Sequence, residues 1–155
     1  MSIFITNSAL ATKNLGKKIA RALVANHDGS ALVIALYGDL GSGKTTLTQG
    51  IADGLGIKDR ITSPTFVLMK KFSNLYHIDC YRLQKPTDIL GLGWQEIMEN
   101  PKNIVVVEWP ERIKKFLPQK AINIKFKFAS LNQRKITIVR MVVQVHIHSD
   151  HPSGL

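Results

Sequence analysis

The sequence predicts an α/β fold: a three-layer sandwich built on a mainly parallel central sheet with antiparallel additions. The first observation behind this prediction is the apolar run Ala31–Tyr37, which is typical of a central strand covered on both faces. The second is a helical segment from Lys44 to about Leu55, which a glycine-rich loop joins to that strand. The third is the gathering of strand-like segments late in the chain, which indicates antiparallel strands beside a parallel core.

Two elements are predicted before the central strand. Ile3–Thr6 has the pattern of a short strand. Ser8 can cap a helix that runs to about Asn26, and Asp28-Gly29-Ser30 then breaks the helix. Apolar side chains recur at helical spacing within this segment, at Leu15, Ile19 and Leu23.

The middle of the chain is predicted to add a hairpin and an interrupted helix. Residues 66–72 and 75–81 have strand-like composition and flank the turn residues Ser73-Asn74. Lys85–Asn100 is predicted to be helical or irregular, because Gly91 and Gly93 interrupt it.

The last third of the chain is predicted to complete the sheet. Asn103–Val107 is a second buried strand, and a short helix through Phe116 follows it. Ala121–Phe128 alternates apolar and polar side chains, as a half-buried strand does. Residues 135–147 form a further strand region whose apolar phase changes near Arg140-Met141, which predicts a bulge or bend.

Length and composition indicate a single globular unit. The chain has 155 residues, of which 45% are hydrophobic and 21% charged. We expect one domain over residues 1–140, then a strand continuation and tail over residues 141–155. The apolar runs are too short to cross a bilayer, no secretory signal is visible, and Cys80 alone forms no internal disulfide. The expected location is therefore the cytoplasm, with no membrane partner.

The formal net charge of +10 leaves two interpretations open. A basic protein attracts polyanions such as nucleotides, nucleic acid or an acidic partner. The positive residues are spread along the chain without a long basic tract, however, so they equally fit an ordinary solvated surface.

The glycine-rich loop is a complete P-loop motif. It reads Gly38-Asp39-Leu40-Gly41-Ser42-Gly43-Lys44-Thr45, with Thr46 next, between a predicted strand and a predicted helix. Glycines let backbone N–H groups turn inward around phosphate oxygens, and the helix directs its positive end at the same anion. Lys44 is expected to reach the β- and γ-phosphates and Thr45 to bind Mg²⁺, so the three-layer fold is P-loop NTPase-like.

A P-loop site needs a further acid near the magnesium ion. Glu108 ends the apolar run Ile104–Val107, and Asp79 ends the strand-like segment Leu75–Ile78. Ligands of doubly wound sheets lie beyond the carboxyl ends of the strands, where both acids are predicted to be. The residue types and their positions alone leave open which acid binds the metal and which positions the attacking water.

Ser63-Pro64-Thr65-Phe66 lies between the P-loop helix and the hairpin. Its hydroxyl groups could sense the γ-phosphate, as switch segments of other P-loop proteins do. A plain proline-containing turn is the alternative interpretation.

Together these motifs resemble the bacterial TsaE (YjeE) family. The resemblance rests on the P-loop, on Ser63–Phe66, on Tyr76–Leu83 and on Val107–Arg112, in that order along the chain. It implies a small ATPase required for threonylcarbamoyladenosine at position 37 of tRNAs that read codons beginning with A. Such an ATPase would be weak alone, would act with the TsaB–TsaD complex, and would meet tRNA through that complex.

The resemblance also implies roles for matching residues. Lys44 and the loop amides would hold the phosphates of ATP or ADP, while Thr45 and Glu108 would form the magnesium site. Asp79 would be the acid linked to hydrolysis, and Thr65 a switch residue. Trp109 matches a tryptophan near the nucleotide, and Thr12 matches a threonine near the adenine.

The C-terminal segment departs from the family pattern. Family members usually end close to the last strand, whereas this chain continues from Met141 to Leu155. A metal site is one interpretation of this segment and a solvated tail is the other. The side chains in question are His146, His148, Asp150 and His151.

Two other functions remain open on the residues alone. A small-molecule P-loop kinase would share the strand, loop and helix, although no arginine-rich lid is visible. A basic nucleic-acid-binding module with structural ATP would explain the charge. We also expect hydrolysis to need completion in trans, because the sequence offers few candidates for an arginine finger. Arg82 and Arg112 are the arginines nearest to the acidic motifs.

Overall fold

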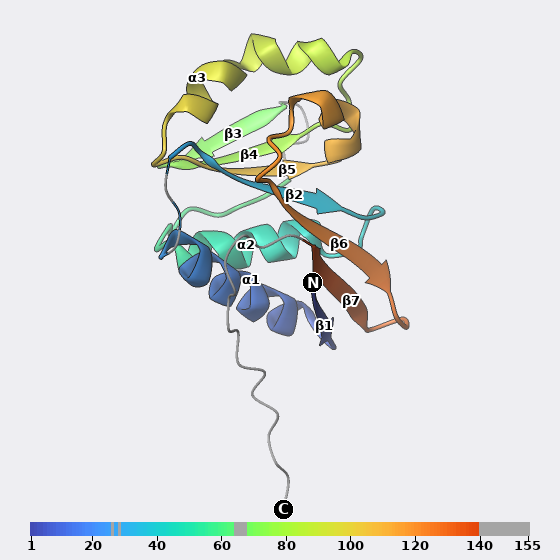
Figure 1. The fold of residues 1–155 in the computed structure, drawn as a ribbon. Helices are drawn as coiled ribbons and strands as arrows, with labels where there is room; N and C mark the ends of the chain where they lie inside the picture. Colours follow the sequence, from blue (N-terminus) through green and yellow to red (C-terminus); the bar gives the residue numbers. More distant parts are fainter. Residues whose placement is uncertain (26, 28, 64–67, 140–155) are drawn as a thin grey trace, which may run out of the picture.

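The computed structural model describes residues 1–25, 27, 29–63 and 68–139. Its strands form one seven-stranded sheet, in the order β1-β7-β6-β2-β5-β4-β3. Two α-helices and a short third one accompany the sheet, together with two 3-10 helices (Figure 1). The strands are Ser2–Thr6 (β1), Leu32–Tyr37 (β2), Met69–Phe72 (β3), Leu75–Asp79 (β4), Ile104–Glu108 (β5), Ile122–Phe128 (β6) and Arg134–Val139 (β7). The helices are Ala9–Val24 (α1), Lys44–Gly54 (α2), Pro86–Leu92 (η1), Trp94–Glu99 (α3) and Pro110–Phe116 (η2).

The centre of the sheet is parallel and its edges are antiparallel. Strand β2 pairs in parallel with both β5 and β6, and β4 pairs in parallel with β5. Antiparallel pairing adds β3 to one edge, and β7 and then β1 to the other. The predicted α/β sheet with antiparallel additions is confirmed, and with three parallel and three antiparallel pairings it is a mixed sheet.

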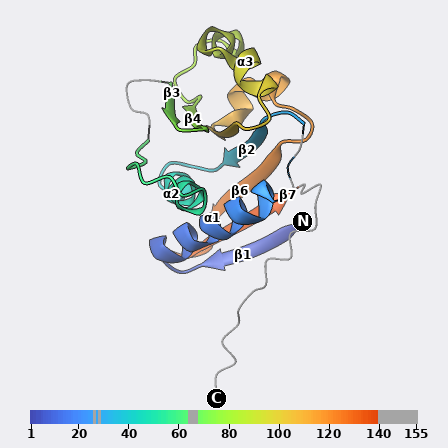
Figure 2. The same cartoon turned by 90° about the vertical axis from the view of Figure 1, so that its left-hand side faces the viewer.

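Helices cover both faces of the parallel core, which gives the three predicted layers. Helices α1 and α2 pack on one face, while η1, α3 and η2 lie on the other (Figure 1). Strands β2 and β5 are buried along almost their whole length because they lie between these layers. In the turned view β1 lies alongside α1, at the edge of the sheet opposite to β3 (Figure 2).

The contact between α1 and α2 depends on glycine. A Cβ at Gly50 would overlap the backbone carbonyl oxygen of Lys13, and a Cβ at Gly16 would overlap that of Leu47. Backbone oxygens cannot move aside as a flexible side chain does, so only glycine permits this separation of the two helices. The close packing fixes the position of the helix that begins at the P-loop.

Most element boundaries agree with the expectations. The Ser8 hydroxyl caps α1 by accepting from the Ala11 amide at 3.0 Å, although the helix ends at Val24 rather than near Asn26. The hairpin forms, and the interrupted segment divides into η1 and α3 at Gly93, which has a φ of 78°. The described part of β7 ends at Val139, so the predicted bulge and the C-terminal tail lie outside the described residues. Among the described residues, no helix is long and apolar enough to span a membrane.

Candidate nucleotide-binding site

The P-loop connects the carboxyl end of β2 to the first turn of α2. Gly41 and Gly43 have φ values of 73° and 104°, which side chains with a Cβ rarely adopt. Gly43 also occupies the N-cap position of α2, where no side chain caps the helix. The free amides at this helix start therefore face the loop, and this arrangement suits an anion.

The Lys44 ammonium group lies against the loop itself. Its Nζ donates to the carbonyl oxygens of Gly38 at 2.5 Å and Asp39 at 2.9 Å. It also lies 5.0 Å from the centroid of the Trp109 ring. Burial lowers the pKa of Lys44, and the nearby carboxylates of Glu108 and Asp79 oppose this shift. A cation is thus held inside the loop, where an incoming phosphate would stabilise its charged form.

The two predicted acids lie side by side at the ends of neighbouring strands. The register of β4 and β5 pairs Asp79 with Glu108, so both side chains are on the sheet face that α2 covers. Glu108 is only 4% exposed. Its Oε1 accepts from the Thr45 hydroxyl at 3.3 Å and lies 2.9 Å from His77 Nε2. The Thr45 hydroxyl also bonds the Ser63 hydroxyl at 2.6 Å.

Asp79 has different surroundings from Glu108. Its Oδ1 accepts from the backbone amide of Tyr81 at 2.9 Å. Burial raises the pKa of Asp79, the Glu108 carboxylate raises it further, and the Tyr81 amide opposes the shift. Of these two acids, only Glu108 shares a hydrogen bond with the P-loop threonine in the described part of the chain. The structure therefore separates two acids that the sequence left equivalent.

A pocket of about 480 Å³ lies between the P-loop and these acids. We call it the P-loop pocket. Its lining brings together most of the predicted site, together with Tyr81 and the candidate arginine Arg82. The lining residues are Leu40, Gly41, Ser42, Gly43, Lys44, Thr45, Thr46, Ser63, Asp79, Tyr81, Arg82, Glu108 and Trp109.

Trp109 closes one side of this pocket. It follows β5 directly and has a left-handed backbone, with a φ of 54°. Its ring lies 4.9 Å from the Tyr81 ring, at an interplanar angle of 48°. Of the two arginines considered for catalysis, Arg82 lines the pocket, whereas Arg112 donates to the Leu83 carbonyl at 3.4 Å and does not line it.

A second pocket of about 300 Å³ lies on the other side of the loop. We call it the side pocket. It shares Gly41, Gly43 and Thr46 with the P-loop pocket, and Thr12, Asn132 and Arg134 are among its other lining residues.

Thr12 is a buried residue of the side pocket rather than a surface threonine of its helix. Only 3% of it is exposed. Its hydroxyl is hydrogen-bonded to the Thr6 hydroxyl at 2.8 Å and donates to the Ser8 carbonyl at 3.2 Å. Its methyl carbon would lie 3.7 Å from a Cβ at Gly43. Thr12 therefore lies beside the P-loop with its hydroxyl already engaged.

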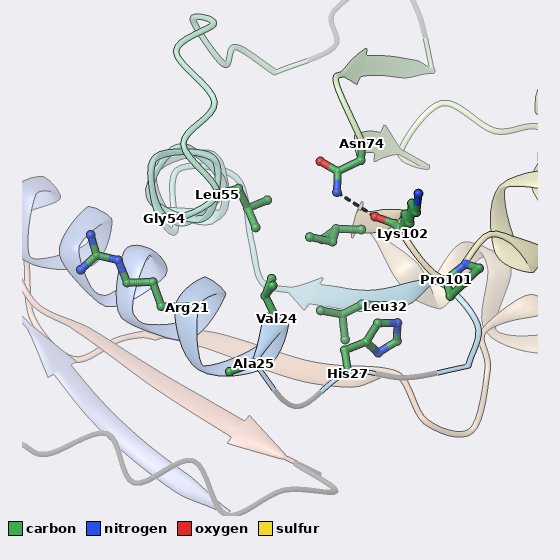
Figure 3. Close-up of a pocket in the computed structure, with 11 residues that line it drawn as sticks. Arg21, Val24, Ala25, His27, Leu32, Gly54, Leu55, Asn74, Pro101 and Lys102 are labelled. Atoms are coloured by element: carbon green, nitrogen blue, oxygen red, sulfur yellow. Dashed lines mark hydrogen bonds between the residues drawn. The ribbon is translucent and has the colours of Figure 1, made fainter.

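A larger pocket of about 670 Å³ lies at the opposite end of the sheet (Figure 3). Leu32 and Ile104, the first residues of β2 and β5, belong to its mostly apolar lining. It contains neither a P-loop residue nor a carboxylate. Cavity size therefore does not identify the functional site of this chain, whereas the side chains around the P-loop do.

Several residues of the site were not singled out from the sequence. The sequence around His77 shows only a strand pattern, which indicates no functional role. Asn132 and Arg134 lie near a turn between two late strands, and this pattern indicates none either. The signal that could have found His77 is its place two residues before Asp79, on the same face of a strand. Thr65 and the histidines of the C-terminal tail lie outside the described residues.

The side chains present fit a magnesium ion bound together with a nucleotide. Thr45 and Glu108 offer a hydroxyl and a carboxylate, the oxygen donors that Mg²⁺ prefers. Within the described ranges, no group of three or more His, Cys, Asp or Glu side chains is placed to hold a metal alone. Phosphate and water oxygens would therefore have to complete the coordination, as is usual for Mg²⁺.

Comparisons with known proteins agree with this geometry. Residues 6–136 match the model of the family described as Threonylcarbamoyl adenosine biosynthesis protein TsaE. This chain is also similar to proteins from several bacteria that are named tRNA threonylcarbamoyladenosine biosynthesis protein TsaE. The Nostoc protein is 41% identical over 135 residues, covering 82% of this chain and 78% of the relative. The Treponema pallidum protein is 36% identical over 137 residues, covering 86% and 97%.

A solved structure shows the same fold. The crystal structure of Bacillus subtilis YdiB superimposes with a TM-score of 0.70 at 32% sequence identity. The superposition covers 88% of this chain and 83% of that one. The family match extends from β1 into β7 and thus includes the P-loop and both acids. The chain belongs to the TsaE family.

Proposed function

We propose that this chain is an ATPase that supports threonylcarbamoyladenosine modification of tRNA. The observation that carries the proposal is the hydrogen bond from Thr45 to Glu108. It joins the P-loop threonine to the acid that a P-loop site needs beside its magnesium ion. The names of the matched relatives supply the pathway, and the modified base would be adenosine 37 of tRNAs reading ANN codons.

The two pockets suggest how a nucleotide lies. The phosphates of ATP or ADP would occupy the P-loop pocket, with Lys44 and the loop amides as donors. The nucleoside would then occupy the side pocket, because the two pockets meet at Gly41, Gly43 and Thr46. The Arg134 guanidinium lies there, 4.3 Å from the Phe128 ring, and offers a flat cation on which a base can stack.

Glu108 and Asp79 would have different roles in hydrolysis. Mg²⁺, when bound at Thr45 and Glu108, would offset the charge on the phosphates. Asp79 would position the attacking water and accept its proton. Its raised pKa makes it a better proton acceptor than an ordinary aspartate, and Tyr81 holds one of its oxygens in place.

We also propose that hydrolysis is completed by partner proteins. Lys44 lies against its own loop carbonyls, and Arg82 is the arginine of the described residues that lines the P-loop pocket. A partner surface could supply further charge or contact the segment that follows Ser63. We infer that the TsaB–TsaD complex is this partner, in the cytoplasm, and that tRNA is met through it.

The test is phosphate release from ATP with and without purified TsaB–TsaD. We expect weak release alone, clear stimulation by the complex, and loss of both with Lys44→Ala. Lys120→Ala is the matched control, because Lys120 is exposed and does not line the pocket. Transfer of radiolabel from ATP to a metabolite instead of water would support the kinase alternative. Equal rates with and without TsaB–TsaD would refute the dependence on partners.

A further inference from the structure

His77 is a buried histidine in the strand that carries Asp79. Its exposed fraction is 0%. It pairs in register with Val106, while Asp79 pairs with Glu108, so His77 lies diagonally across from Glu108 on one face of the sheet. The strands around it bury aliphatic side chains such as Leu75 and Ile104. An imidazole in such surroundings costs free energy unless its polar atoms are hydrogen-bonded.

The hydrogen bond of His77 has a defined direction. Nε2 lies 2.9 Å from Glu108 Oε1. In the described part of the chain, Nδ1 has no hydrogen-bond partner. An ionised carboxylate only accepts hydrogen bonds, so we assign the proton to Nε2 and make His77 the donor. His77 thus uses its one hydrogen bond on Glu108.

This donor acts on the same oxygen as the P-loop threonine. Glu108 Oε1 accepts from both His77 and Thr45. For Oε2, no hydrogen bond is found to the described residues, and Glu108 lines the P-loop pocket. Two donors on one oxygen fix the rotation of the carboxylate, and this leaves the second oxygen available to a ligand in the pocket.

We propose that His77 is a positioning residue that holds Glu108 for Mg²⁺ and thereby sets the magnesium requirement for nucleotide binding. The proposal rests on the proposed function, because it needs a Mg²⁺–nucleotide complex in the P-loop pocket. Loss of an outer-shell hydrogen bond of this kind typically weakens metal binding about 10- to 100-fold. Binding of the phosphates without metal uses Lys44 and the loop amides, which do not contact His77 through any described hydrogen bond.

Two amide substitutions form a matched pair for the test. The side-chain nitrogen of His77→Gln extends about as far as Nε2 and can donate to Glu108. The nitrogen of His77→Asn is placed like Nδ1 and falls short of it. Both variants bury one polar amide, so they differ mainly in the reach of the donor. His77→Leu removes the donor at similar volume.

The measurement is ADP binding by calorimetry in EDTA and across a Mg²⁺ titration. We expect all variants to bind ADP in EDTA within about twofold of the wild type. The Mg²⁺ concentration that gives half of the change in ADP affinity is expected to be about tenfold higher for His77→Asn and His77→Leu than for the wild type. For His77→Gln it is expected to rise less than about threefold. Unchanged Mg²⁺ requirements in His77→Asn would overturn the proposal. So would equal losses with and without Mg²⁺, because they would show a merely structural role.

A double-mutant cycle tests whether His77 acts through Glu108. In a Glu108→Gln background, His77→Asn is expected to add less than about twofold to the Mg²⁺ requirement. A full additional effect would overturn the proposed route. Failure of the wild type itself to bind ADP, or to respond to Mg²⁺, would instead refute the proposed function. If His77→Leu does not fold, the comparison of Gln with Asn still decides the question.

Discussion

The hydroxyl of Thr45 lies 3.3 Å from Oε1 of Glu108, although 63 positions separate the two residues in the chain. Parallel pairing of β2 with β5 produces this contact, since Leu36, which precedes the P-loop, pairs with Glu108. The carboxyl ends of both strands therefore meet at one edge of the sheet. In this way the P-loop and the acid that we propose for Mg²⁺ become parts of one candidate site.

The first prediction separates the two acids. Glu108→Gln is expected to raise the Mg²⁺ requirement for ADP binding at least about tenfold, because the amide is a poor magnesium ligand. Asp79→Asn is expected to leave that requirement within about threefold and to lower phosphate release about 100-fold, because the proton acceptor is lost. Calorimetry and phosphate release in the presence of TsaB–TsaD measure the two effects. The reverse pattern would exchange the two roles.

The second prediction concerns the side pocket. Arg134→Ala is expected to weaken ADP binding about fivefold while leaving pyrophosphate binding unchanged, because only ADP carries a base to stack on the guanidinium. Lys135→Ala is the matched control, since the neighbouring side chain is exposed and does not line the pocket. Competition between ADP and pyrophosphate gives both affinities. An equal loss for the two ligands would place Arg134 with the phosphates instead.

The third prediction concerns the contact between α1 and α2. Gly50→Ala is expected to lower the free energy of unfolding by about 1–3 kcal/mol or more, because the added methyl group overlaps the Lys13 carbonyl. Gly91→Ala is the control, as nothing lies within 4 Å of a Cβ built there. Urea unfolding followed by circular dichroism measures both. Equal stability of the two variants would mean that the helices can separate without cost.

The fourth prediction is a pH dependence at Cys80. Burial raises the pKa of this thiol from 9.0 to about 12, and the carboxylates of Asp79 and Glu111 add to the shift. Only the thiolate reacts with iodoacetamide, so at pH 8 the folded protein should react about a thousandfold more slowly than a free thiol.

The labelling rate of Cys80 should rise with pH up to about 12 in the folded state and level off near 9.0 in urea. The folded state keeps a proton that the unfolded state releases above pH 9.0, so Cys80 makes the fold less stable as pH rises beyond that value. Mass spectrometry of the labelled chain provides the measurement. Rapid labelling of the folded chain at pH 8 would contradict the buried position.

The local sequence determined the parts of this protein that depend on short-range patterns. The P-loop was visible because the glycines, Lys44 and Thr45 are consecutive between a strand and a helix. Asp79 and Glu108 were visible because each ends a strand. The family could be identified because four such motifs occur in a fixed order, and the residues matched by the family model include all of them.

Only the tertiary structure decided how these motifs face one another. Whether Glu108 or Asp79 meets Thr45 depends on strand order and register, which long-range packing sets. His77 has the pattern of any buried strand residue until β5 is placed beside it. Thr12 becomes part of the P-loop surroundings only because glycine lets α1 pack closely on α2. Pairings between distant segments depend on the whole core rather than on neighbouring residues, so the sequence could indicate the chemical groups but not their contacts.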